Sequence, residues 1–361
     1  MLILVINPGS TSTKVAIFED ENIKIDKVIR HKPYELEKFD SLMAQKEYRE
    51  KAILEFLKSN GYKIDDFDAI ACRGGILPPL KSGTYIVNEE MVNYLKYKSK
   101  VEHASNLAAV IGFELSNGKI PVFITDPVSV DEMVDEARIS GIPEIKRLSL
   151  AHALNIKAVG RKVASELGKK YEELNMVIAH LGGGISVTAH RKGKMIDVNN
   201  ANDEGPFSPE RTGDLPVGDV VKLCFSGKYN HKEVKKMFVG KGGLVAYLGT
   251  NNMKEALEMA KSDEYAKLIV DAMAYQIAKE IGGMCAILKG EVDAIVITGG
   301  IANNNEFVEN IKSYIYNFAP IFNIPGEFEM EALALGALRV LKGEEKALTW
   351  GEKYEKVERI T

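Results

Sequence analysis

Short apolar runs alternate with amphipathic stretches along this chain, which is the pattern of an α/β protein. Runs rich in β-branched residues predict strands at 2–6, 13–18, 69–72, 122–125, 176–180, 185–189, 195–198 and 294–298. Apolar residues at helical spacing predict helices at 49–58, 105–115, 151–167 and 265–288. The last of these contains Gly282-Gly283, which would weaken an isolated helix, so we expect a close packing contact there.

The segment VINPGSTSTKVAIF (5–18) places a polar loop between two predicted strands. Its backbone N–H groups and small hydroxyls are donors that suit an anion of high charge density, and Gly9 lets the backbone come close. The side chains that contribute are Asn7, Ser10, Ser12 and Lys14. A P-loop would need a second glycine before the lysine and a helix after it, and neither is present. Taken alone, the segment is equally compatible with a Gly- and Ser-rich hairpin turn.

A second segment, MVIAHLGGGISVTAH (176–190), repeats this arrangement of strand, Gly-rich loop and β-branched strand. Gly9 and Gly182 are 182 − 9 = 173 residues apart, and Asn7 and His180 are separated by the same number. The spacing is about one domain, which favours a duplicated domain with a phosphate-facing hairpin in each half. Chance similarity of two Gly hairpins is the alternative. Because Gly182, Gly183 and Gly184 are followed by a strand, a dinucleotide-binding fingerprint is excluded.

A third glycine loop lies in AIVITGGIANNNEFVENI, where a predicted strand ends in Thr298-Gly299-Gly300 and a helix begins shortly afterwards. Paired glycines at a strand-to-helix turn, here Gly299 and Gly300, admit a flat ligand against the backbone. Asn303 and the two asparagines after it offer amide hydrogen bonds, although one of them can equally be an N-cap.

Composition limits the class of protein. At 361 residues the chain is longer than a single core usually grows, so we expect two domains. The formal charge of −4 gives no reason to expect a nucleic acid or an acidic membrane as partner. Cys72, Cys224 and Cys285 are scattered without CxxC spacing, which suits a reducing cytoplasm. MLILVINPGS is typical of a first strand rather than a signal peptide, and no apolar run approaches membrane-spanning length. We therefore expect a cytoplasmic two-domain protein.

The three loops VINPGSTSTK, AHLGGGISV and ITGGIANNNEF, with RTGDLPVGD between the last two, resemble the acetate kinase and butyrate kinase family. The resemblance covers nearly the whole chain. TDPVSVDEM and the lack of acetate-kinase-like insertions are similar to butyrate kinase and branched-chain fatty acid kinase. The family belongs to the acetate–sugar kinase, Hsp70 and actin superfold, which implies an α/β fold of two ribonuclease-H-like (actin-like ATPase) domains related by duplication, with an interdomain cleft. We place these domains at 1–150 and 151–334, with a C-terminal helix at about 335–361 that packs back on the first.

The resemblance also implies an activity. It is reversible phosphoryl transfer from ATP to a short-chain carboxylate, ATP + butanoate = ADP + butanoyl phosphate, with Mg²⁺ bound and with branched acids such as isobutyrate as further substrates. The phosphates would lie on the first loop, and the protein would be a homo-oligomer, a dimer or larger. Acetate or propionate kinase is the alternative among enzymes, and a nucleotide-dependent binding protein of the actin or Hsp70 kind is the alternative outside them.

The acceptor of such a reaction is already ionised at neutral pH, so no general base is required. The site must instead hold two anions together and stabilise charge on the transferring phosphoryl group. Arg211, in EGPFSPERTGDLPVGD, matches the family arginine that contacts this group, with a surface salt bridge as the alternative. His180 matches a family histidine and is expected to hydrogen-bond the transferring oxygen, with a structural histidine as the alternative.

Two carboxylates match the family positions linked to magnesium. Asp126 follows the predicted strand 122–125 at its carboxyl end, where open α/β sheets bind ligands, although Pro127 makes a plain turn an alternative. Glu331, in GEFEMEALALGAL, corresponds to the magnesium-linked glutamate, with Glu329 and Glu327 as alternatives. Both Asp126 and Glu331 are therefore expected near Mg²⁺.

The substrate carboxylate is assigned to Arg73. The acetate kinase pattern has an arginine a few residues ahead of His-Gly-Gly, whereas here Cys72-Arg73-Gly74-Gly75 puts the arginine directly before the glycines. Bidentate pairing by Arg73 would hold the substrate carboxylate. His103, in KVEHASNLA, matches a family histidine near the substrate, and a helix N-terminal histidine is the alternative. The apolar residues 76–78 suggest the lining of an acyl pocket.

Overall fold

The structure is a computed structural model that describes residues 1–99 and 101–351. The chain forms two compact units, unit 1 from Met1–Asp131 together with the chain from Phe328 onward, and unit 2 from Glu132–Glu327. The sequence-based boundaries at 150 and 334 differ from this division, since 132–150 belong to unit 2 and 328–334 to unit 1. The expected C-terminal helix at about 335–361 is described only as far as residue 351, where a helix over Glu329–Leu341 is followed by a strand at Leu348–Thr349, and 352–361 lie outside the described residues.

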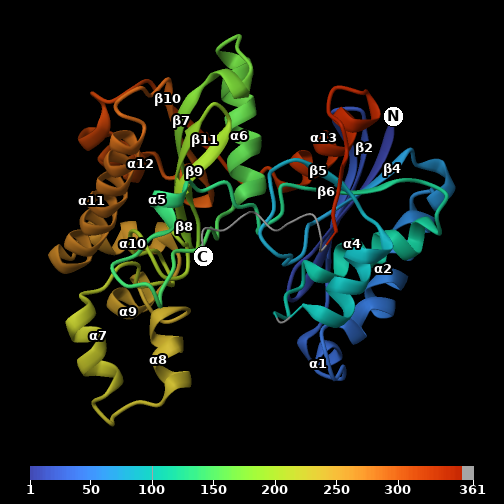
Figure 1. Ribbon diagram of the computed structural model, residues 1–361. Helices are drawn as coiled ribbons and strands as arrows, with labels where there is room; N and C mark the ends of the chain where they lie inside the picture. Colours follow the sequence, from blue (N-terminus) through green and yellow to red (C-terminus); the bar gives the residue numbers. More distant parts are fainter. Residues whose placement is uncertain (100, 352–361) are drawn as a thin grey trace. The chain divides into compact units, whose positions relative to one another are not determined.

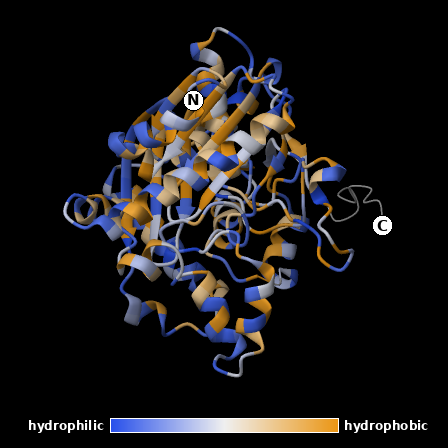
Figure 2. Ribbon diagram, turned by 90° about the vertical axis from the view of Figure 1, so that its left-hand side faces the viewer, coloured by the Kyte–Doolittle hydropathy of each residue, from blue (hydrophilic) through white to orange (hydrophobic). Residues whose placement is uncertain are grey.

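Unit 1 contains a seven-stranded sheet in the order β12-β5-β6-β4-β1-β2-β3. Its strands are β1 (Leu2–Pro8), β2 (Ser12–Glu19), β3 (Asn22–Arg30), β4 (Ala69–Cys72), β5 (Thr84–Ile86), β6 (Val122–Thr125) and β12 (Leu348–Thr349). Its helices are α1 (Pro33–Leu36), α2 (Lys46–Ser59), α3 (Glu89–Asn93), α4 (Asn106–Ser116) and α13 (Glu329–Leu341). Figure 2 shows the strands near the N-terminus coloured largely as apolar, in keeping with their burial on both faces.

Unit 2 contains a five-stranded sheet in the order β11-β10-β7-β8-β9. Its strands are β7 (Asn175–Leu181), β8 (Ile185–Arg191), β9 (Lys194–Val198), β10 (Ala294–Gly299) and β11 (Ile321–Pro325). Its helices are α5 (Asp135–Arg138), α6 (Ala153–Glu166), α7 (Val217–Cys224), α8 (His231–Phe238), α9 (Leu244–Leu248), α10 (Met253–Ala260), α11 (Glu264–Ile287) and α12 (Asn305–Ile315). All of the strands and helices that the sequence pattern predicts are present, with ends that differ by up to three residues, and all of them except β1 are labelled in Figure 1.

The two sheets repeat one topology. Strands β3-β2-β1-β4-β6 and β9-β8-β7-β10-β11 have the same order, with an antiparallel three-stranded part followed by two parallel strands. The offset falls from 173 to 185 − 13 = 172 residues after the hairpin loop, because the second loop is one residue shorter. A β-bulge after Ile17 recurs after Ala189, at the same offset of 189 − 17 = 172. These repeated details support duplication over chance similarity of two Gly hairpins.

The fourth strand of each repeat also begins and ends alike. Asp68 precedes β4 and accepts a hydrogen bond of 2.7 Å from the first residue of β1, while Asp293 precedes β10 and accepts one of 2.8 Å from the first residue of β7. At the same offset, 293 − 68 = 225, the turn Arg73-Gly74-Gly75 corresponds to Thr298-Gly299-Gly300. The third glycine loop of unit 2 therefore has a counterpart in unit 1, and that counterpart carries Arg73.

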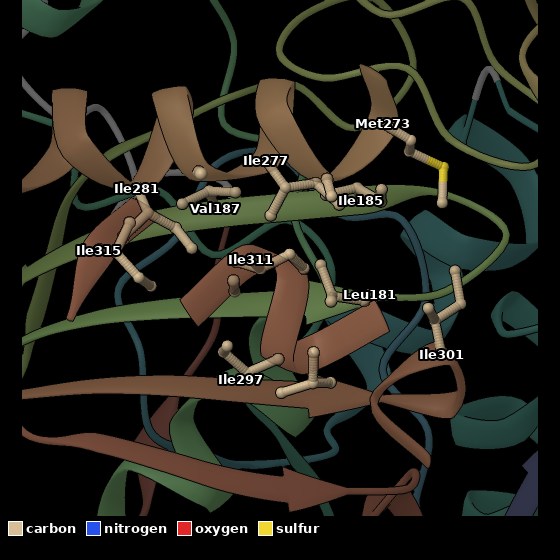
Figure 3. Packing of buried hydrophobic residues seen from close by; sticks show 14 of the residues in the cluster. Leu181, Ile185, Val187, Met273, Ile277, Ile281, Ile297, Ile301, Ile311 and Ile315 are labelled. Carbon is tan, nitrogen blue, oxygen red and sulfur yellow. The ribbon is translucent and has the colours of Figure 1, made fainter. Parts of the chain in front are cut away.

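Helices cover both faces of each sheet. In unit 2, side chains of α11 and α12 such as Ile277 and Ile311 pack with Leu181 and Ile297 of the strands in one apolar cluster (Figure 3). The other face of the sheet packs against α6 (Figure 1). Successive strand residues point to opposite faces, so His180 lies on the α6 face while Leu181 lies in the cluster.

The close packing contact expected at Gly282-Gly283 is absent. A Cβ at Gly282 would be 3.6 Å from the ring of Phe318, which is ordinary van der Waals contact, and a Cβ at Gly283 would meet nothing within 4 Å. The 24-residue helix α11 continues through both glycines, because its buried face supplies the stability that they remove.

Two helices connect the repeats. Helix α6 follows β6 in the chain and packs on β7 and β10, whereas α13 follows β11 and packs on β1, β4 and β6. Each uses a glycine for the closest approach, since a Cβ at Gly160 of α6 would be 3.0 Å from Ile178, and one at Gly336 of α13 would be 2.1 Å from Thr125 Oγ1.

Among the helices of the described residues, none combines the length and the hydropathy that a membrane crossing requires.

Candidate functional site

The hairpin between β1 and β2 positions the first polar loop. Asn7 is buried near the end of β1 and pairs in register with Lys14 of β2. The N–H of Gly9 donates to the carbonyl of Ser12 at 2.8 Å and closes the loop, and Ser10 at its tip is exposed. The loop thus presents short polar groups at the carboxyl end of β1.

Glu329, in the first turn of α13, is the centre of a charged cluster in unit 1. Its Oε2 accepts a hydrogen bond of 2.9 Å from Asn7 Nδ2 and forms an ion pair with Arg73 Nη1. Burial tends to raise the pKa of Glu329, but Arg73, Asn7 and Lys14 together hold it below its ordinary value. Glu329 is therefore a partly buried carboxylate that stays ionised and fixes Arg73 after β4.

The structure separates the three candidate glutamates. Glu329 contacts Asn7 and Arg73, whereas the side chain of Glu331 forms no hydrogen bond or ion pair with any described residue and Glu327 is exposed. Residues two apart on a helix point to different sides, so Glu329 and Glu331 do not face one site. Glu329 is thus the glutamate that adjoins Asn7 and Arg73, and the magnesium role assigned to Glu331 stays a prediction.

Arg73 also lies near His103, the other expected substrate residue. Burial, and then the charge of Arg73, lowers the pKa of His103 below its ordinary value. The Nδ1 atom of His103 is 2.7 Å from Ser105 Oγ, which orients the ring. Asn106, at the start of α4, accepts a hydrogen bond of 2.8 Å from the N–H of Ile76 and so fixes the turn after Arg73. Asn106 was not predicted, although a buried Asn at a helix start is a recognisable signal.

Asp126 directly follows β6 and is completely buried. Its φ of 38° is unusual for a residue with a side chain, and two hydrogen bonds to Gly83 hold it there. The N–H of Gly83 donates to Asp126 Oδ1 at 2.8 Å, and the N–H of Asp126 donates to the carbonyl of Gly83 at 3.1 Å. A Cβ at Gly74 would be 2.3 Å from Pro127, so the turn after Arg73 lies against the residue after Asp126.

In unit 2, His180 near the end of β7 is buried and stacked on a second histidine. The rings of His152 and His180 are 4.1 Å apart and nearly parallel, at 15°. Asn155 Nδ2 donates to His180 Nδ1 at 2.9 Å and also lies 3.3 Å from Thr298 Oγ1. With Nδ1 as acceptor, neutral His180 carries its proton on Nε2, the atom that faces Gly182. His152 and Asn155 were not predicted, although both lie in the short segment AHALN that begins α6.

Arg211 lies directly against the glycine loop of unit 2. A Cβ at Gly184 would be 2.0 Å from Arg211 Nη1, so only glycine leaves room for the guanidinium. Nη1 donates to the carbonyl of Ala201 at 2.7 Å, and burial lowers the pKa of Arg211. Ser208 Oγ donates to the carbonyl of Gly183 at 2.7 Å and fastens the same loop. His180, the glycines and Arg211 thus form one cluster.

The third glycine loop adjoins this cluster. Gly299, with a φ of 92°, packs so closely that a Cβ would be 2.3 Å from the carbonyl oxygen of Leu181. Gly300 is exposed, and a Cβ there would meet nothing within 4 Å. Asn303 Nδ2 donates to the carbonyl of Gly300 at 3.0 Å, while Asn304 occupies the N-cap position of α12. The backbone of Gly300 is therefore open to a ligand.

Unit 1 thus gathers one set of expected residues and unit 2 another. The first set is Asn7, Lys14, Arg73 and His103 with Glu329, and the second is His180, Gly182–Gly184, Arg211 and Gly299. Among the described residues, no three His, Cys, Asp or Glu side chains come together as a metal cluster. Protein carboxylates alone therefore do not form a closed metal site in the described chain.

Known proteins with similar sequences span nearly the whole chain. "Probable butyrate kinase 1" of Thermotoga maritima is 61% identical over 354 residues, which are 98% of this chain and 99% of the relative. A "Probable butyrate kinase" of Thermotoga petrophila is also 61% identical, over 96% of this chain and 97% of the relative.

The fold likewise has solved counterparts. The crystal structure of Porphyromonas gingivalis acetate kinase matches with a TM-score of 0.77 at 19% identity, over 94% of this chain and 99% of that one. At this identity the match shows the fold alone, an actin-like fold with two α/β domains. The model of the acetokinase family matches residues 81–319. With this match and with relatives of 61% identity over almost all of its length, the chain belongs to the acetokinase family.

Proposed function

We propose that the chain is an ATP-dependent short-chain fatty acid kinase with butanoate as acceptor, ATP + butanoate = ADP + butanoyl phosphate in either direction. The observation that carries the proposal is the 61% identity, over 98% of the chain, to a relative named as a probable butyrate kinase. The chemistry of the two clusters supports it, because one is suited to a carboxylate and the other to a phosphoryl group.

Arg73 is the residue that binds the acceptor carboxylate in this proposal. It already pairs with the carboxylate of Glu329 through Nη1, so its remaining N–H groups are available for a second, bidentate carboxylate. His103 contributes a neutral donor, since its lowered pKa keeps it uncharged near pH 7. Leu77, buried beside this turn, and half-buried Ile76 provide apolar surface for the short acyl chain.

Arg211 and His180 act on the transferring phosphoryl group. Phosphoryl transfer spreads negative charge over three oxygens, and preorganised donors stabilise it without reorganisation. Arg211 is fixed by Gly184 and by the carbonyl of Ala201, and the Nε2–H of His180 faces the glycine loop. His152, stacked on His180, belongs to the same group of donors.

In this proposal, the three glycine loops bind the phosphates and the nucleoside of ATP. Asn7, Ser10, Ser12 and Lys14 with the loop backbone are assigned to phosphate oxygens. The backbone at Gly182–Gly184 is assigned to phosphate, and the open backbone at Gly299 and Gly300 with Asn303 to the nucleoside.

Magnesium would be held by Asp126 and Glu329 together with phosphate oxygens of ATP. The donor set fits, because Mg²⁺ in kinases uses one or two carboxylates, water and substrate phosphates. Asp126 is completely buried at the end of a strand of unit 1 and Glu329 is partly buried at the start of a helix, and Glu331 is the less suitable glutamate. When bound, the ion neutralises negative charge on the phosphates.

A hydroxamate assay tests the proposal and its alternatives. The purified chain is incubated with ATP, Mg²⁺ and butanoate, isobutyrate, propionate or acetate, and acyl phosphate is trapped with hydroxylamine. We expect butanoate to give the highest kcat/KM. A high rate with acetate or propionate alone would identify the chain as a kinase for those acids. No acyl phosphate from any acid would favour an actin- or Hsp70-like binding protein.

We also propose that the chain is cytoplasmic and that it forms a homo-oligomer. The cysteines support a reducing compartment, because all three are free in the structure and two of them, Cys72 and Cys285, are buried. Analytical ultracentrifugation of the purified chain measures the assembly, for which we expect a dimer or a larger species.

A further inference from the structure

Arg49 of α2 is a completely buried arginine whose hydrogen bonds converge on the first polar loop. Its Nη1 donates to the carbonyls of Gly9 and Ser12, both at 2.9 Å, and its Nη2 donates to the carbonyl of Ser10 at 2.9 Å. Gln45 on the same helix accepts from Nε and Nη2, at 3.2 and 2.9 Å. One guanidinium therefore fixes three carbonyls of a four-residue loop.

These contacts decide where the loop N–H groups point. In a trans peptide the C=O of one residue and the N–H of the next point in opposite directions. The carbonyls of Gly9 and Ser10 face Arg49, so the N–H groups of Ser10 and Thr11 face away from it. Neither N–H donates to any described residue, and both residues are exposed. Two adjacent donors directed at solvent are the arrangement that an anion requires.

Among the described residues, no carboxylate balances the charge of Arg49. All of its acceptors are carbonyl, amide or hydroxyl oxygens, and no described Asp or Glu forms an ion pair with it. Burial lowers the pKa of Arg49 to about 10, so the side chain remains cationic at neutral pH. A buried cation without a counter-ion is costly, and neutral side chains could also hold a loop. The positive charge of Arg49 is thus explained if its counter-ion is an anion bound on the far side of the loop.

We propose that Arg49 is the positioning residue of the phosphate-binding loop, which it holds with the Ser10 and Thr11 N–H groups directed at the phosphate while its own charge is balanced by that phosphate. The inference deepens the proposed function, on which it rests for the assignment of the loop to phosphate. It names a residue that does not touch the phosphate and acts through the loop backbone.

The test uses inorganic phosphate as probe and the full chain in four forms: wild type, Arg49→Met, Arg49→Lys and Lys46→Met. Lys46 is a matched control, because it lies on the same helix but is partly exposed and paired with Glu114. Hydrogen–deuterium exchange of a peptide that contains residues 9–12 reports the loop, and the rise in Tm with phosphate reports binding.

Phosphate should slow exchange of the loop in wild type and in Lys46→Met. In Arg49→Met the protection should be lost and phosphate binding should weaken at least about tenfold, a usual effect of removing a group that orients ligand donors. Arg49→Lys keeps the charge but donates fewer hydrogen bonds, so it should keep part of the Tm response while its loop exchanges faster.

Arg49→Met with wild-type protection would overturn the inference. If Arg49→Met does not fold, Arg49→Lys decides, since unchanged exchange of its loop overturns the inference and faster exchange supports it. If neither variant folds, wild type decides, because a loop that phosphate does not protect overturns the inference. Hydroxamate formation by wild type is measured in parallel. This assay tests the proposed kinase activity separately, so that a failure of the kinase proposal is distinguished from a failure of the role inferred for Arg49.

Discussion

Arg211 occupies the space in which a side chain of residue 184 would lie, and this relation explains the third glycine of the unit 2 loop. A glycine run in sequence indicates close approach but does not say of what. The structure identifies the neighbour as the guanidinium, held also by the carbonyl of Ala201. The position of Arg211 therefore depends on two segments, the glycine loop and the segment that carries the arginine itself. They are almost thirty residues apart in the chain, about the length of a supersecondary unit.

Gly184→Ala should displace Arg211 and leave the fold intact. A Cβ at residue 184 would be 2.0 Å from Nη1, and loss of one stabilising donor lowers kcat by about 10²-fold or more. Gly183→Ala is the matched control, because its Cβ would be 3.6 Å from the nearest atom, Glu210 Oε2, and a smaller loss is expected. Steady-state kinetics with ATP and circular dichroism measure both. Equal losses in the two variants would contradict the displacement of Arg211.

His31 should make the stability of the chain depend on pH. Its Nε2 is 2.8 Å from Thr13 Oγ1, and burial, followed by the charge of Arg49, lowers its pKa from 6.5 to about 4. Between these values the unfolded chain binds a proton that the folded chain does not, so the free energy of unfolding falls as the pH falls. This contribution is fully present above pH 6.5 and is lost by about pH 4.

The variant His31→Gln removes this titration but retains a hydrogen-bonding side chain. Urea unfolding near neutral pH and at about pH 5 should therefore show a smaller difference in midpoint for the variant than for wild type. The same difference in both proteins would show that another group controls the pH dependence.

At the scale of elements, α13 carries one residue of the proposed site and packs against the sheet of unit 1. Its first turn carries Glu329, and its Gly336 contacts Thr125, the last residue of β6 before Asp126. The helix thus positions one carboxylate directly and lies against the strand that carries the other. Its close approach depends on the absence of a side chain at residue 336.

Gly336→Val should lower the free energy of unfolding by about 1–3 kcal/mol, because overpacking forces the helix away from β6. Gly283→Ala is the control within a helix, since its Cβ meets nothing within 4 Å, and it should raise stability by up to about 1 kcal/mol. Urea denaturation measures both. No loss of stability in Gly336→Val would contradict the packing of α13 on β6.

The sequence pattern predicted the helices and strands more accurately than the contacts between their residues. Buried strands and long amphipathic helices such as α11 were predicted because periodicity is a local property. The edge strand β3 was missed, since its residues are mostly exposed and lack a continuous apolar run. The resemblance led to Glu331, whose magnesium role stays a prediction, whereas the contact of Glu329 with Arg73 is visible only in three dimensions. Arg49 gave no signal, because a lone arginine in a helix is usually a surface residue.

At the scale of the whole molecule, the chain is a duplicated fold whose two copies carry different chemistry. The corresponding turns after β4 and β10 hold Arg73 in unit 1 and Thr298 in unit 2. In unit 1 the cation pairs with the carboxylate of Glu329, and in unit 2 the hydroxyl belongs to the network of Asn155 and His180. In the proposed function, matching positions of the two repeats therefore differ in role, with acceptor binding at Arg73 in unit 1 and phosphoryl stabilisation in unit 2.

Phosphorus NMR of the purified chain with ATP, Mg²⁺ and butanoate tests the central claim most directly. We predict that a butanoyl phosphate signal grows together with ADP in equal amounts, and that both require butanoate, since the acceptor oxygen attacks the γ-phosphorus. Release of inorganic phosphate and ADP without an acyl phosphate would contradict the account.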